Sequence, residues 1–157
     1  MSVSVKMNFN LRRFNLDLHK ELNEIGRIVR RDHNNRLERG KGIQGSMRDL
    51  KPATIKAKQR SSDSRVRNNA SKILVATGQM RNLEVEEATT ANQEVEIHPG
   101  RIRPYKGTNV TMADVGEFHQ TGAGNLPVRE WFGITPDVER RAIKHIENEI
   151  ERAIRRA

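Results

Sequence analysis

The spacing of apolar residues changes twice along this chain of 157 residues, and the change limits the folds that it can adopt. Near the N-terminus Leu18, Leu22, Ile25 and Val29 are spaced four, three and four, which predicts an amphipathic helix over about residues 16–34. The middle of the chain alternates with period two, as strands do, and the end returns to a helical period. The pattern predicts an α+β fold, in which long N- and C-terminal amphipathic helices pack on a small antiparallel β-sheet.

Two segments in the middle of the chain, residues 83–88 and 93–98, predict a β-hairpin with a loop of about four residues. Shorter strands are expected at residues 3–9 and, as an edge strand, at 101–105. One face of the hairpin is apolar, and the other carries four carboxylates, Glu84, Glu86, Glu94 and Glu96. Because these carboxylates repel one another across the strands, we expect a cationic group near this acidic face.

The last segment has the clearest helix signals. Thr135 is a good N-cap and Pro136 suits the first helical position. The expected apolar stripe consists of Ile143, Ile146, Ile150 and Ala153 or Ile154.

The positive charge lies in the first half of the chain. Residues 1–70 hold 17 Lys/Arg against 7 Asp/Glu, whereas residues 71–157 hold 12 against 13. Within one expected domain over residues 1–157, residues 36–70 are predicted to be a basic, extended and mobile segment with a small helix beginning at Pro52. Its cations are candidates for contact with DNA or with a neighbouring subunit: Arg36, Arg39, Lys41, Arg48, Lys51, Lys56, Lys58, Arg60, Arg65 and Arg67.

No set of residues predicts an active site. The chain has no cysteine, so a disulfide framework, a thiolate metal site and a cysteine nucleophile are excluded. His119 and Glu117 lack a spaced third metal ligand, and we expect His119 to pack at a helix end and to bond the adjoining loop. Neither an enzymatic activity nor a cofactor is expected. The absence of a long apolar run predicts a protein that is soluble, is made in a cytoplasm and does not enter a membrane.

Three runs of sequence carry a resemblance to a known family. Residues 50–58 (LKPATIKAK) are similar to "Leu-Lys-Pro-Ser-Thr-Ile-x-x-Lys", and residues 74–82 (LVATGQMRN) to "Leu-x-x-Thr-Gly-x-Leu-Arg-x-Ser", with Met80 and Asn82 as departures. Residues 115–136 contain "aromatic-His-Gln-x-Gly" followed by "Pro-x-Arg-x-aromatic-Phe-Gly-Ile". The chain resembles the virion morphogenesis, or tail-completion, proteins of tailed phages, notably Mu-like phages. The motif residues of the third run are His119, Gly122, Pro127, Arg129, Trp131, Phe132 and Gly133.

The resemblance implies a structural virion protein that terminates the tail and joins it to the head connector. By analogy with tail terminators it implies a homo-oligomeric ring, six-fold, around the DNA channel. Its partners would be the tail tube, the head-completion or connector proteins and channel DNA without sequence preference. The protein would be assembled in the host cytoplasm and end at the head–tail junction.

Two alternatives stay open from the residues alone. The first is a non-enzymatic nucleic-acid-binding protein that uses the basic residues 36–67, although few aromatic residues accompany them. The second concerns Trp131 and Phe132, which fit either the core, fastening the last helix to the sheet, or an anchor between subunits.

Overall fold

A computed structural model describes residues 5–8, 17–100 and 109–156 of the chain. Its elements, in chain order, are β1 (Val5–Asn8), α1 (His19–Glu38), α2 (Pro52–Gln59), α3 (Ser64–Asn68), the short 3-10 helix η2 (Gln79–Arg81), β2 (Leu83–Glu86), β3 (Glu94–Pro99), α4 (Met112–Thr121) and α5 (Pro136–Arg156). The mixed helix and strand content confirms the predicted α+β class. The edge strand expected at 101–105 and the ends of the strand expected at 3–9 lie outside the described residues.

The described part of the sheet has three antiparallel strands in the order β1-β3-β2. The predicted hairpin is confirmed, since Val85 lies opposite Ile97 and Glu86 lies opposite Glu96. Val95 and Ile97 are fully buried. A Cβ atom placed on Gly26 of α1 would come within 3.1 Å of Val95, so α1 lies closely on this apolar face. The carboxylates of the hairpin therefore lie on the opposite face.

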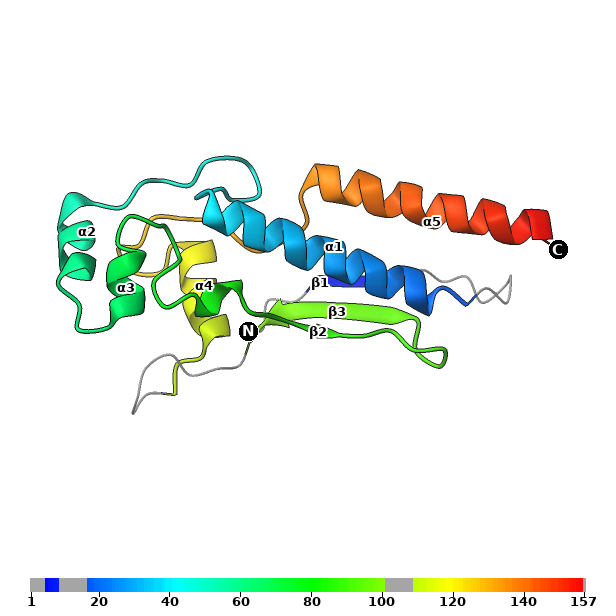
Figure 1. Cartoon of the computed structure of the whole chain (residues 1–157), viewed down its shortest axis with the longest axis horizontal. Coiled ribbons are helices and arrows are strands. Elements are labelled where there is room, and N and C mark those ends of the chain that lie inside the picture. Colours follow the sequence, from blue (N-terminus) through cyan, green and yellow to red (C-terminus); the bar gives the residue numbers. More distant parts are fainter. Residues whose placement is uncertain (1–4, 9–16, 101–108, 157) are drawn as a thin grey trace.

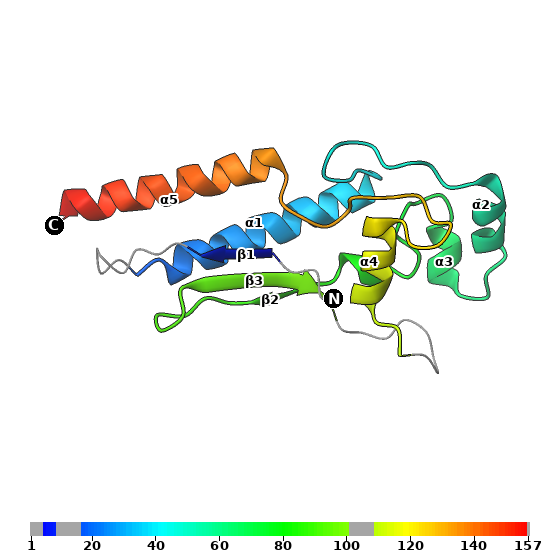
Figure 2. The same cartoon turned by 180° about the vertical axis from the view of Figure 1, so that it is seen from behind.

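The C-terminal helix α5 packs mainly on α1 rather than on the sheet (Figures 1 and 2). The buried residues of α5 are Val138, Ala142 and Ile146, a row with a spacing of four. The predicted stripe is therefore only partly correct, because Ile143 and Ile154 are 45% and 67% exposed. The small side chain of Ala142 in this row lets the two helices approach closely.

The basic residues 36–70 contain more regular structure than expected, and the long extension is not confirmed. Helix α1 continues to Glu38, four residues beyond the predicted end, and α2 begins at Pro52 as predicted. A third helix, α3, begins after Asp63, whose carboxylate accepts a hydrogen bond from the backbone N–H of Arg65 at 2.8 Å. Such an N-cap satisfies a donor that the helix itself leaves unpaired. The two short helices lie at one end of the molecule (Figure 1).

Candidate functional site

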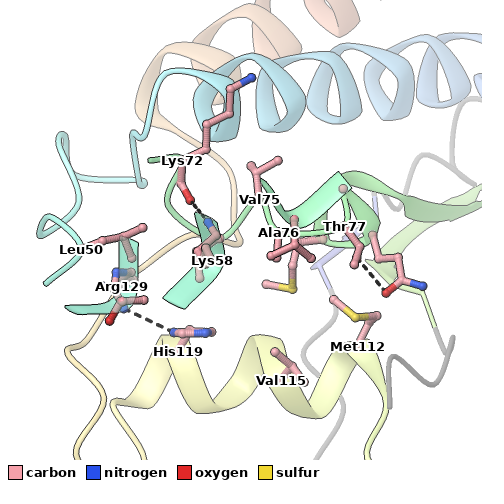
Figure 3. A pocket seen from close by; sticks show the side chains of 16 residues that line it. Leu50, Lys58, Lys72, Val75, Ala76, Thr77, Met112, Val115, His119 and Arg129 are labelled. Atoms are coloured by element: carbon pink, nitrogen blue, oxygen red, sulfur yellow. Dashed lines mark hydrogen bonds between the residues drawn. The ribbon is translucent and has the colours of Figure 1, made fainter. Parts of the chain in front are cut away.

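The three runs that carry the resemblance line one pocket of about 370 Å³. The first run provides Leu50, Thr54 and Lys58 from α2 and the loop before it. The second run provides every residue from Leu74 to Met80, and α4 and the following loop provide four more (Figure 3). Val66 of α3 and Lys72 complete the lining. The complete lining is Leu50, Thr54, Lys58, Val66, Lys72, Leu74, Val75, Ala76, Thr77, Gly78, Gln79, Met80, Met112, Val115, His119 and Arg129.

Helix α4 forms one wall of this pocket because of how it begins and ends. Thr111 and Asp114 make a reciprocal capping box at its start, with bonds of 2.7 and 3.2 Å. Gly122 ends the helix in the left-handed conformation, at φ +73°, which glycine adopts at little cost. On the wall between them, Met112, Val115 and His119 are spaced three and four and so share one face of the helix. As expected from the sequence, His119 lies at a helix end.

Arg129 is the main cation of the pocket. Its side chain is deeply buried, at 5% exposure for the residue, and its backbone N–H donates to the carbonyl of His119 at 2.7 Å. The guanidinium donates through Nε and Nη2 to the carbonyl of Arg48, both at 3.4 Å. Burial, together with the nearby charge of Arg48, lowers the pKa of Arg129. None of the residues that line the pocket is Asp or Glu.

The imidazole of His119 faces the same guanidinium, with Nδ1 3.5 Å from Nη1 of Arg129. Burial and the charge of Arg129 both lower the pKa of His119, so the ring is neutral near pH 7. Because the guanidinium has only donors, Nδ1 acts as the acceptor and the proton is on Nε2. The pair therefore presents one fixed charge and one neutral ring to the pocket.

The two lysines of the pocket are engaged within the chain. Lys58 donates from Nζ to the carbonyls of Asn69 and Lys72, at 2.6 and 2.8 Å, and burial lowers its pKa. These two bonds tie α2 to the chain that follows α3. Lys72 forms an ion pair with Glu38, at the end of α1. Arg129 is therefore the pocket cation that lacks a strong partner among the described residues.

Leu74, in the second run, has a strained backbone. Its φ of 56° is the only positive value among the non-glycine residues that the structure describes. The left-handed conformation costs a residue with a Cβ atom about 1 kcal/mol or more. Strain of this kind concentrates at functional sites, where the surrounding structure holds it in place.

The aromatic residues of the third run form the support behind the pocket. Trp131 is 1% exposed, and its indole Nε1 donates to the carbonyl of Gly116 at 2.8 Å. The amide oxygen of Gln120 accepts from the backbone N–H groups of Trp131 and Phe132, at 3.1 and 3.3 Å. His33 of α1 packs on both rings. Trp131 and Phe132 thus belong to the core, where their contacts join α4 to α1.

Pro127 is half-buried in the loop of the third run, and the motif glycines shape its ends. A Cβ atom on Gly122 would lie 2.8 Å from Val128, and Gly133 has φ +144°. Both positions therefore favour glycine.

The predicted basic contacts separate into two groups. Arg36 is buried: it pairs with Asp32 at 2.7 Å and donates to the carbonyls of Trp131 and Gly133. This role was missed, because nothing near Arg36 in the sequence marks a partner about a hundred residues away. Lys58, Arg65 and Arg67 are also engaged with nearby groups. Six others are exposed and have no side-chain partner among the described residues: Arg39, Lys41, Arg48, Lys51, Lys56 and Arg60.

The acidic face of the hairpin contains a histidine that the sequence reading left out. His98 lies opposite Glu84 in the sheet, and its ring nitrogens are 3.6 and 3.4 Å from the carboxylates of Glu84 and Glu86. The alternation of the strand, which places residue 98 on the face of residues 94 and 96, is the signal that could have found it. The cation expected near this face is thus supplied in part, when His98 is protonated.

Among the described residues, no group of three or more His, Cys, Asp or Glu is arranged to hold a metal ion. In the same part of the chain, every helix is too short or too polar to cross a membrane. In comparisons with known proteins, no family model, no curated protein and no solved structure matches this chain.

Proposed function

We propose that this chain is a structural virion protein of a tailed phage that completes the tail and joins it to the head connector. Its subunits form a six-membered ring around the DNA channel at the head–tail junction, and its role includes no catalytic step. One observation carries the proposal: the three runs that resemble the tail-completion family line one pocket. Runs that are separate in sequence but converge in space favour a shared role over chance similarity.

The distribution of charge supports an assembling subunit. The unpartnered cations Lys51, Lys56 and Arg60 lie in α2 and at its two ends, and α2 lies at one end of the molecule, while the β2–β3 loop lies toward the other (Figures 1 and 2). In the ring, the α2 end of one subunit meets the acidic sheet face of the next. A contact between two different surfaces is heterologous, and such contacts close into rings when the rotation allows.

A second candidate is a protein that binds nucleic acid without enzymatic activity, through residues 36–67. The observation that favours it is the set of exposed cations without side-chain partners in the described structure. The two candidates differ in their response to salt. Binding to phosphates weakens in proportion to the charges neutralised, whatever the sequence of the nucleic acid. A contact between subunits responds instead to the charges of the acidic face.

The test combines charge reversal with an assembly assay. Lys51→Glu with Lys56→Glu should prevent rings, as measured by native mass spectrometry and negative-stain imaging, and should leave heads and tails unjoined in a complementation assay. Adding Glu84→Lys and Glu86→Lys to the same chain should restore ring formation and the joining of heads to tails. The matched control is Lys20→Glu on α1, an exposed cation away from α2, which should assemble normally. Loss of duplex DNA binding in the double variant, with assembly intact, would favour the second candidate and contradict the first.

A further inference from the structure

The buried guanidinium of Arg129 has much of its hydrogen-bonding capacity unused. It has five N–H donors, and its contacts within the described structure are two bonds of 3.4 Å to one carbonyl and a 3.5 Å approach to His119. Bonds from a charged donor to a carboxylate are much shorter, about 2.7–2.9 Å. A charge removed from water is costly unless it is paired, so the site favours an anionic partner.

The rest of the pocket is suited to an apolar group. Leu50, Val66, Val75 and Val115 line it, together with the two methionines Met80 and Met112. Methionine side chains adapt to ligands of irregular shape. The volume of about 370 Å³ is at the small end of the range for small-molecule sites.

We propose that this pocket binds a ligand with an apolar body that ends in one carboxylate. The carboxylate pairs with the guanidinium of Arg129, and the apolar body lies against Met80, Met112 and Val115. Since no Asp or Glu lines the pocket, a positive charge on the ligand would have no partner there. The ligand is thus a monoanion, either a free aliphatic acid or the C-terminal carboxylate of an apolar protein segment. The site does not depend on the proposed role in the virion.

Two further features agree with a ligand site. The neutral ring of His119 adds no second charge beside Arg129. The strained Leu74 lies in the same lining.

Methionine methyl groups provide the assay. In protein labelled with [methyl-13C]methionine, Met80 and Met112 report on the pocket. Titration with octanoate should shift both signals in a saturable way. 1-Octanol, which has the same chain without the charge, should bind roughly tenfold or more weakly, because hydrogen bonds to charged groups are the stronger ones.

Variants test the role assigned to the guanidinium. Arg129→Met should bind octanoate and octanol equally. The matched control is Lys56→Met, which removes an exposed cation of α2 that does not line the pocket, and it should bind both ligands as the original chain does. If Arg129→Met does not fold, Val115→Trp provides the second variant: it fills the pocket and should abolish binding of both ligands.

A peptide pair separates the two sources of the ligand. N-acetyl-Ala-Leu-Leu with a free carboxylate should bind more tightly than its carboxamide. If the free-acid peptide binds more tightly than octanoate, a protein C-terminus is the natural occupant, and the reverse order assigns the site to a free acid. Equal binding of octanoate and octanol to the original chain would overturn the proposal, as would a preference for octanoate that survives in Arg129→Met.

Discussion

Replacement of Trp131 by alanine tests the support behind the pocket most directly. The ring is 1% exposed and lies 5.3 and 5.5 Å, between centroids, from the rings of His33 and Phe132. Emptying a buried site of this size costs about 3–5 kcal/mol in free energy of unfolding. For a chain of this length, Tm falls by about 2–4 °C for each kcal/mol of lost stability, so we expect a fall of roughly 6–20 °C.

Trp131→Phe separates the ring from its hydrogen bond. It keeps most of the apolar contact and removes the indole N–H that donates to the carbonyl of Gly116. We expect a loss of about 1–2 kcal/mol, most of it from that bond and from the smaller ring. The two variants together therefore distinguish packing from hydrogen bonding.

Far-UV circular dichroism during urea and thermal unfolding is the suitable measurement, because Trp131 is the only tryptophan and its fluorescence disappears in both variants. Phe118→Ala is the control: this aromatic residue is 41% exposed, and its removal should cost less than about 1 kcal/mol. A Tm for Trp131→Ala within about 2 °C of the original would refute the reasoning, because the indole would then contribute little to the folded state.

Three further predictions follow from the same structure. Gly116→Ala should destabilise the chain by about 1–3 kcal/mol in a urea titration, because the new Cβ atom would lie 2.2 Å from the indole; an unchanged midpoint would contradict this contact. Burial lowers the pKa of His33 to about 4, so the folded state resists its protonation. Above about pH 6.5, the pKa of histidine in the unfolded chain, this contribution to the free energy of unfolding is fully present. As the pH falls from 6.5 toward 4, the free energy of unfolding decreases by about 3 kcal/mol in all. His33→Asn should remove this part of the pH dependence, and an unchanged profile would assign it to other groups. The loop of residues 48–51 before α2, which is largely exposed, should be cleaved more quickly by protease in the free subunit than in the assembled ring, and equal rates in both would show that assembly does not cover it.

The sequence predicted the elements whose signals are local. The pairing of the hairpin strands, the acidic face of Glu84 and Glu86 and the start of α5 at Pro136 all depend on alternation or capping within a few residues. The loop between the strands is longer than the predicted four residues, because β2 ends at Glu86 and β3 begins at Glu94. The start of α2 at Pro52 was predicted for the same reason. His119 and Arg129 were identified through the resemblance, but as motif residues and not as two groups that face each other across a pocket.

The tertiary structure decided what joins distant parts of the chain. Arg36 belongs to a charged segment by sequence, yet it is buried against the carbonyl of Trp131, 95 positions away. Helix α5 packs on α1 with the row of Ala142 buried and Ile143 exposed, although both rows are apolar in the sequence. The pocket itself requires three separate runs to meet. Local patterns record which side of an element is apolar, but the partner of a buried charge and the shape of a cavity depend on contacts between residues far apart in sequence, which no local pattern specifies.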